Sequence, residues 1–280
     1  MSQAAPIQAL SVGHALDADS AGLGVVHSVF ARAVNLMIHT EMWTLLAADK
    51  SDLPFGIRVA LADFDVLGLR NGDPVKVRAG FVSIGSGSTC CVVDCRAAPR
   101  WLPARHYKIE PGLADRLAVV AKAASDRSWH ESAQMAQAVR SALESPAALS
   151  DVLAKVVGRG PGSTPSGDDV LVGILAALNS PHSGAAGNKA AESLGRAILP
   201  LLWTTSDISR HLLRQAVKGL FARDVHELVL ALLGNLAPQQ LRNTIRRVIE
   251  TGATSGADTC MGLLAFAQSF LIPREERAAA

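Results

Sequence analysis

The first 105 residues alternate short apolar runs with turn signals, a pattern typical of β-strands. NGDP at 71–74 and SIGSGSTC at 83–90 are the clearest turns between these runs. About six strands of this kind predict a small β-barrel or β-sandwich. The expected strands lie within the runs VVHSVFARAVNLM, WTLLAA, GIRVALA, PVKVRAGFVSI and TCCVVDC.

Beyond Pro103 the spacing of apolar residues becomes helical. A first stripe runs through Leu113 and Leu117, four residues apart on one helix face. Gly234 stands where a helix C-cap belongs, and Pro238 takes a first-turn position. The further helices expected from this pattern cover 129–143, 147–157, 169–178, 186–202, 207–220, 225–233, 239–249 and 257–270.

Together the two patterns predict an α+β fold of two domains. A mostly-β barrel or sandwich is expected over 1–105, and an all-helical domain of roughly nine helices over 106–280. The length of 280 residues, with 49% hydrophobic and 19% charged residues, supports a packed globular protein.

The charge balance argues against polyanionic partners. Lysine and arginine number 27 against 25 acidic residues, so neither nucleic acid nor an anionic membrane is an expected partner. The first twenty residues lack the basic and apolar regions of a secretory leader, and no apolar run approaches the roughly 18 residues of a membrane helix. These features predict a soluble, cytoplasmic protein.

Three of the four cysteines stand together at Cys90, Cys91 and Cys95. Their spacing has no paired CxxC and no nearby set of histidines, as a zinc site would require. Buried strand cysteines are the favoured interpretation, and no protein metal site is predicted.

A short motif occurs twice in the helical half, as GSTPSGDD at 162–169 and GATSGAD at 252–258. Aligning Ser-Gly with Ser-Gly pairs Asp169 with Asp258, and it also pairs Gly173 with Gly262. Each aspartate lies four residues before its glycine, on the same helix face. We therefore expect the two helices to cross at the glycines, with the aspartates together at one end.

The chemistry of two such helix starts favours a ligand that has an anionic part and an amide part. First-turn N–H groups and a glycine-rich approach suit an anion, and the carboxylates suit amide donors. The lysine and the GK[ST] ending of a P-loop are absent. Candidate catalytic residues are Asp169 and Asp258, and candidate substrate-binding residues are Gly162, Thr164, Ser166, Gly167, Asp168, Thr205, Ser206, Thr254, Ser255 and Gly256.

Simple helix capping is the alternative interpretation of the same residues. Ser166 or Asp168 would cap the helix expected at 169–178, and the run Thr204–Asp207 would cap the helix expected at 207–220. As a functional alternative, that run would form a third helix start facing the same ligand. No cofactor is identified, and the two aspartates beside the loop leave magnesium as an option.

The sequence resembles the AllH-type subunits of the FdrA-associated oxamate carbamoyltransferase. The resemblance is carried by GPGSTPSGDDVLVGILAAL, TTSDISRHLLRQAVKG and TGATSGADTCMGLL, with a weaker match at VVHSVFARAVNL and at WLP near residue 101. It therefore spans nearly the whole chain. This copy reads GST at Ser163 where the family pattern is GLT, and it reads GADT at 256–259.

The resemblance implies anaerobic purine and allantoin catabolism. In that activity, a complex of three kinds of subunit interconverts oxalurate plus phosphate with oxamate plus carbamoyl phosphate. It implies FdrA-like and other complex subunits as partners, and it assigns no catalytic residue to this chain. The SxRT phosphate loop of the familiar transcarbamylases is absent, so the activity would use a different fold.

Two other functions remain open. The chain could be a non-catalytic subunit of the complex, structural or metabolite-sensing, while FdrA-like chains perform the chemistry. It could also be a magnesium-dependent phosphoryl-transfer enzyme, which the lack of a phosphate-binding lysine in the motif disfavours.

Overall fold

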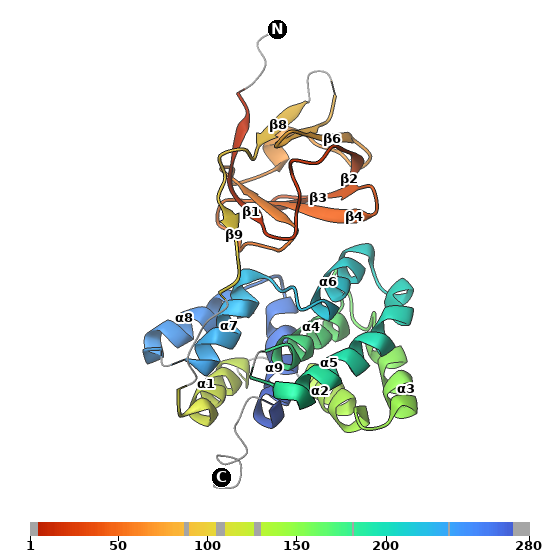
Figure 1. Cartoon of the computed structure of the whole chain (residues 1–280), viewed down its shortest axis with the longest axis vertical. Coiled ribbons are helices and arrows are strands. Elements are labelled where there is room, and N and C mark those ends of the chain that lie inside the picture. The colour runs from red at the N-terminus through yellow and green to blue at the C-terminus, as the bar shows by residue number, and fades with distance from the viewer. Residues whose placement is uncertain are drawn as a thin grey trace. The chain divides into compact units, whose positions relative to one another are not determined.

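The computed structural model describes residues 5–86, 90–104, 110–125, 130–180, 182–234 and 236–270. The chain divides into two compact units, residues 1–104 and residues 105–280, and Figure 1 draws both. The boundary expected at residues 105 and 106 lies outside the described residues, as do Trp129 and residues 87–89 of the expected turn.

The N-terminal unit is an eight-stranded β-barrel, which confirms the expected β-rich architecture. The strands follow the order β5-β4-β3-β2-β6-β7-β8-β1, and pairing of β1 with β5 closes the ring, so that both ends of the sheet lose their open edge. A ninth strand pairs with β1 in parallel. The strands are β1 Ile7–Gly13, β2 Gly22–Phe30, β3 Ala33–Ile38, β4 Glu41–Leu46, β5 Gly56–Val59, β6 Pro74–Arg78, β7 Phe81–Ile84, β8 Cys91–Asp94 and β9 Arg100–Trp101.

Two features of the barrel go beyond the sequence expectation. Strand β1 was not expected, because Gln8 and Ser11 interrupt its apolar positions. The run 25–37 contains a hairpin, since β2 and β3 pair antiparallel around Ala31 and Arg32. The barrel interior is filled by alternate strand residues such as Leu36, Ile57 and Ile84.

The C-terminal unit contains nine α-helices within the described residues, as the helical periodicity predicted. Pro200 follows the end of α5, and a 3₁₀ turn, η3 Leu199–Thr204, replaces the last part of the helix expected to reach residue 202. The helices are α1 Leu113–Ser125, α2 His130–Ala142, α3 Pro146–Val156, α4 Ser166–Leu178, α5 Gly184–Ile198, α6 Asp207–Val217, α7 Arg223–Leu233, α8 Pro238–Ile249 and α9 Ser255–Phe270.

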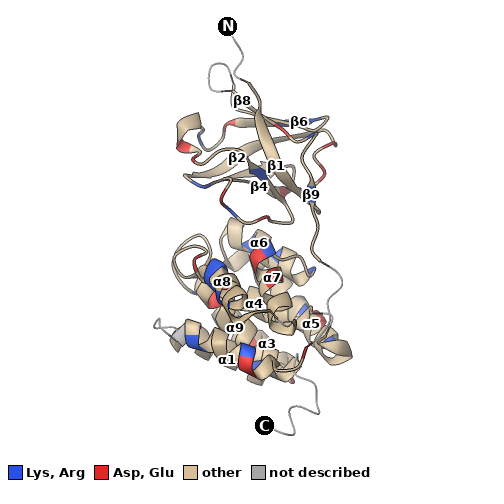
Figure 2. Cartoon of the chain, turned by 90° about the vertical axis from the view of Figure 1, so that its left-hand side faces the viewer, with Lys and Arg blue, Asp and Glu red and all other residues tan. Residues whose placement is uncertain are grey.

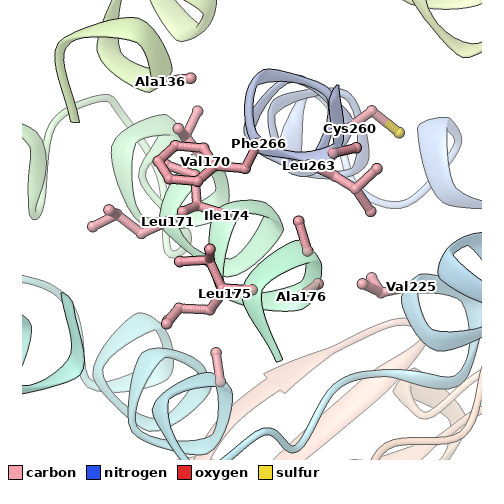
Figure 3. Close-up of a cluster of buried hydrophobic side chains, with 14 of the residues drawn as sticks. Ala136, Val170, Leu171, Ile174, Leu175, Ala176, Val225, Cys260, Leu263 and Phe266 are labelled. Carbon is pink, nitrogen blue, oxygen red and sulfur yellow. The ribbon is translucent and has the colours of Figure 1, made fainter. Parts of the chain in front are cut away.

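Helix α4 forms the centre of the helical unit. Eleven of its thirteen residues are buried, so it is apolar on nearly all sides, as expected of a helix surrounded by others. Figure 3 shows its side chains clustered with those of α9, together with Ala136 of α2 and Val225 of α7. Even Asp168 and Asp169, in the first turn of α4, are therefore enclosed by protein.

The cysteine prediction is confirmed only in part. Cys95 is buried, which raises the pKa of its thiol to about 12, whereas Cys90 is exposed. All four cysteines are free thiols. Among the described residues, no group of three or more histidine, cysteine or acidic side chains could hold a metal ion.

Charged side chains of both signs occur on both units, as Figure 2 shows, in keeping with the net charge of +2. In the part of the chain that the structure describes, no helix is long and apolar enough to cross a membrane.

Candidate functional site

Helices α4 and α9 cross in direct backbone contact at their glycines. A Cβ atom built on Gly173 would lie 1.9 Å from the carbonyl oxygen of Thr259, and one on Gly262 would lie 2.0 Å from that of Val170. The two contacts are reciprocal, because Val170 and Thr259 occupy equivalent positions in the aligned motifs. The predicted crossing at Gly173 and Gly262 is confirmed.

The Ser-Gly step of each motif packs in the same way on the helix before it. A Cβ on Gly167 would lie 2.0 Å from the carbonyl oxygen of Val156 at the end of α3, and one on Gly256 would lie 1.6 Å from that of Val248 in α8. The N–H of Gly167 donates to the carbonyl of Arg159 at 2.9 Å, and the N–H of Gly256 donates to the carbonyl of Thr251 at 3.0 Å. Both glycines thus serve close packing, and their N–H groups already have acceptors.

Asp168 connects three segments of the helical unit. Its Oδ1 accepts from the backbone N–H of Gly158 at 2.8 Å, and its Oδ2 accepts from the hydroxyl of Ser209 at 2.6 Å and from that of Thr205. The residue at the N-cap position of α4 is Pro165, which makes no side-chain capping hydrogen bond. The interpretation of Asp168 or Ser166 as the cap of α4 is therefore wrong.

The hydroxyl cluster before α6 does cap its helix. Ser206 accepts from the backbone N–H of Ser209 at 3.1 Å, which confirms the capping interpretation, and it also donates to the carbonyl of Ser163 in the α3–α4 loop. Arg210 donates to the carbonyls of Leu202 and Thr205. The start of α6 is thereby attached to the start of α4 through internal contacts.

Asp169 and Asp258 are two of the three buried side chains in the described part of the helical unit that have an unpartnered oxygen; Gln215 is the third. The two aspartates are only 6% and 2% exposed. The hydroxyls of Ser255 and Thr164 lie beside Asp169 and 2.8 Å from each other, so one of the two donates to the other; Ser132 of α2 donates to Oδ1 of Asp258. In each carboxyl group, the atom Oδ2 is buried and has no hydrogen-bond partner among the described residues.

The environment of Asp169 favours its protonated form. Burial raises the pKa of this carboxyl group to about 8, and the neighbouring charges of Asp258 and Asp168 act in the same direction. Hydrogen bonds from Ser255 and Thr164 oppose the shift without cancelling it. No lysine or arginine among the described residues contributes to this balance.

The polypeptide that leads into each helix is exposed. Residues 160–163 and 251–254 are accessible, whereas Thr164, Ser166 and Ser255 are half-buried. Gly160 and Gly162 have φ angles of 115° and 91°, which other residues rarely adopt. In the described part of the chain, the N–H groups of Gly160, Gly162 and Ser163 have no hydrogen-bond acceptor. Open donors therefore lie in the loop, and open acceptors lie at the buried aspartates.

Most of the predicted site residues lie around these two helix starts. The exceptions are Thr205 and Ser206, which precede α6 and join the group through Asp168 and the α3–α4 loop. Sequence reasoning missed Ser132 and Ser209. Ser132 lies 126 residues from Asp258, and no local pattern marks it. Ser209 carried a weak signal, three residues after the helix-capping Ser206.

Comparison with known families covers both units. A family model described as oxamate carbamoyltransferase subunit AllH matches residues 156–267, which include both motifs. A second model, described as the AllH family N-terminal domain, matches residues 7–100. No solved structure matches the chain.

Proposed function

The chain belongs to the AllH family of oxamate carbamoyltransferase subunits, and we propose that its helical unit binds the small amide substrate of that enzyme. The proposed reaction interconverts oxalurate plus phosphate with oxamate plus carbamoyl phosphate, in purine and allantoin catabolism in the cytoplasm. The proposed binding site is formed by the paired starts of α4 and α9. FdrA-like and other subunits are the proposed partners.

The observation that carries this proposal is the pair of open acceptors on Asp169 and Asp258. A buried carboxyl oxygen without a hydrogen-bond partner costs about 1–3 kcal/mol in folding free energy, so buried polar atoms are nearly always satisfied. Here the equivalent aspartate in each copy of the repeated motif has one carboxyl oxygen without a partner among the described residues. A ligand that brings N–H donors removes this cost.

The exposed loop supplies the complementary half of the proposed site. The open N–H groups of Gly160, Gly162 and Ser163 suit the carboxylate or phosphate of a ligand. Oxamate, oxalurate and carbamoyl phosphate each carry an anionic group and amide hydrogens a few bonds apart. The distribution of donors and acceptors at the two helix starts therefore supports this class of ligand.

In the proposed reaction, the chain positions the reacting nitrogen. Transfer of the carbamoyl group to oxamate forms a bond from the amide nitrogen of oxamate to the carbamoyl carbon. The bond to phosphate breaks, and a proton leaves the nitrogen. Asp169 and Asp258 would hold the N–H hydrogens and so fix the direction of the nitrogen lone pair. The remaining chemistry is assigned to the complex as a whole.

The test is oxalurate phosphorolysis by the reconstituted complex, measured as carbamoyl phosphate formed. Asp169→Asn and Asp258→Asn should each lower the rate by about 100-fold, the size of effect seen when one positioned catalytic hydrogen bond is lost. Asp151→Asn, at an exposed acidic residue of α3, is the matched control and should leave the rate unchanged. Size-exclusion chromatography checks that every variant still assembles.

Full activity of both site variants in an intact complex would contradict a catalytic role. If, in addition, the unaltered chain alone bound the substrate and the variant chains alone did not, the chain would instead be a non-catalytic, metabolite-sensing subunit.

A further inference from the structure

We propose that Asp169 and Asp258 together recognise one uncharged –NH₂ group, each accepting one of its two hydrogens, and that they exclude a carboxylate from the same place. This inference rests on the proposed function, because it specifies which end of the amide substrate faces the buried aspartates. It makes the two residues the specificity determinants for oxamate and the carbamoyl group.

The number of hydrogen-bond acceptors left open at the two helix starts matches one –NH₂ group. Asp168 is satisfied by three donors, and the Oδ1 atom of Asp258 is satisfied by Ser132. Oδ2 of Asp169 and Oδ2 of Asp258 then remain, one from α4 and one from α9; in the protonated form of Asp169, Oδ2 stays an acceptor when the proton lies on Oδ1. A primary amide nitrogen carries two N–H donors and accepts no hydrogen bond. One –NH₂ group therefore matches the open positions in number and in kind.

The charges around the two helix starts favour a neutral ligand group over an anionic one. Three acidic residues, Asp168, Asp169 and Asp258, are buried around the two helix starts. No arginine or lysine within the described residues forms an ion pair with any of them; Arg159, the nearest arginine along the sequence, pairs with Glu131 instead. A second anionic group placed against the pair would meet repulsion in a low-dielectric setting. A neutral amide would not.

The hydroxyls of Thr164 and Ser255 cannot fill the open positions on the two aspartates. Thr164 and Ser255 lie half-buried between the exposed loops and Asp169, and they come from the two different motifs. Both already interact with Asp169 and with each other. Each hydroxyl has one hydrogen, and one of the two hydrogens is used in the bond between Thr164 and Ser255, so the pair cannot satisfy Oδ2 of both aspartates.

Oxamate and oxalate are the matched probes, because they differ only by replacement of –NH₂ with a carboxylate oxygen. Both carry the same second carboxylate for the loop N–H groups. Sites built to receive an N–H group reject an analogue that lacks it by factors of about 10⁴ when the buried acceptors are left unpaired. We expect the assembled complex to bind oxamate at least 100-fold more tightly than oxalate, a conservative part of that range.

The experiment is equilibrium titration of the assembled complex with each probe. In the double variant Asp169→Asn/Asp258→Asn, the new side-chain amides can donate to an oxygen, so the ratio should fall to about 1 or reverse. Asp151→Asn should keep the original ratio. Circular dichroism and a thermal melt confirm that the variant chains remain folded.

Equal binding of the two probes to the unaltered complex, failure of oxamate to bind, or an unchanged ratio in the double variant would each overturn the inference. Magnesium chloride titrated alone provides a further check. If magnesium bound in an Asp169-dependent way while the oxamate preference did not depend on Asp169, the pair would be a cation site.

The two proposals fail separately. Loss of phosphorolysis in Asp169→Asn with an unchanged probe ratio would leave the proposed function standing and remove this inference. Undiminished phosphorolysis in Asp169→Asn, together with loss of the oxamate preference in the double variant, would remove the proposed catalytic role and leave this inference standing.

Discussion

The starts of α4 and α9 have the same motif and pack in the same way, yet they are attached to their surroundings differently. In both, the Ser-Gly step lies against the end of the preceding helix, and an aspartate follows two residues after the glycine. Asp168 then ties α4 to the start of α6, whereas the equivalent position before Asp258 is the buried residue Ala257. Asp258 is instead held by Ser132 of α2.

The difference separates structural parts from candidate functional parts. Both carboxyl oxygens of Asp168 accept hydrogen bonds from other segments of the unit, and these contacts explain its burial. Asp169 and Asp258 each keep one buried oxygen without a donor, and this is the feature that both copies retain. Stability does not account for it, because each unsatisfied oxygen destabilises the fold.

The largest expected effect comes from breaking what the two copies share, the helix crossing. Gly173→Ala should lower the free energy of unfolding of the helical unit by about 3 kcal/mol or more, because the new methyl group would overlap backbone atoms that cannot rotate away. Gly262→Ala should behave alike. Urea denaturation followed by helical circular dichroism measures the change.

Gly195→Ala is the control for the crossing. Its added methyl group would lie 2.8 Å from Cγ1 of Val217, so this side chain must shift, but alanine favours the helix and the cost should stay below that of overlap with fixed backbone atoms. A Gly173→Ala protein as stable as Gly195→Ala would contradict the close crossing.

The next effect comes from the contact that only α4 has. Asp168→Ala would leave the N–H of Gly158 and the hydroxyls of Thr205 and Ser209 without their shared acceptor, at a cost of about 2–4 kcal/mol in unfolding free energy. Asp207→Ala removes a half-exposed acid at the start of α6 and should cost well under about 1 kcal/mol. Equal costs for the two variants, measured by urea denaturation, would show that Asp168 is not the connecting residue.

An effect that is small near pH 5 and increases with pH is expected at Asp169. The pKa of Asp169 rises from its ordinary value of 3.8 to about 8 on folding, under the influence of burial, Asp258 and Asp168. Between these values the folded chain holds a proton that the unfolded chain releases, so this residue's contribution to stability decreases as pH rises from about 4 to about 8.

Asp169→Asn removes that titration. Relative to the unaltered chain, the variant should gain stability between pH 5 and pH 8, by an amount on the order of a few kcal/mol. Thermal melts across this range measure the difference, with Asp151→Asn as the control. A constant difference at all pH values would contradict the raised pKa.

Much of this architecture can be predicted from the sequence because it depends on local periodicity. The helical spacing from Leu113 onward predicted the helices, and the four-residue step from aspartate to glycine predicted the crossing of α4 and α9. The closure of the barrel by β1 and β5 and the contact between Ser132 and Asp258 were not predictable. Both join residues far apart in the chain, and no local pattern records such a contact.

The same reason explains why helix capping, the alternative interpretation of Asp168, was wrong. Its acceptors serve Thr205 and Ser209, 37 and 41 residues further along the chain. By contrast, the repeat of SGxD made Asp258 visible as the counterpart of Asp169, because self-similarity is a property of the sequence itself.

The measurement that tests the central claim most directly is a double-mutant cycle on oxalurate phosphorolysis by the complex, with Asp169→Asn and Asp258→Asn. If the two carboxylates act on one ligand group, the double variant should lose hardly more activity than either single variant, as residues that act as a unit do. Losses that multiply would mean that the two aspartates act independently, and they would contradict a single site shared by the two helix starts.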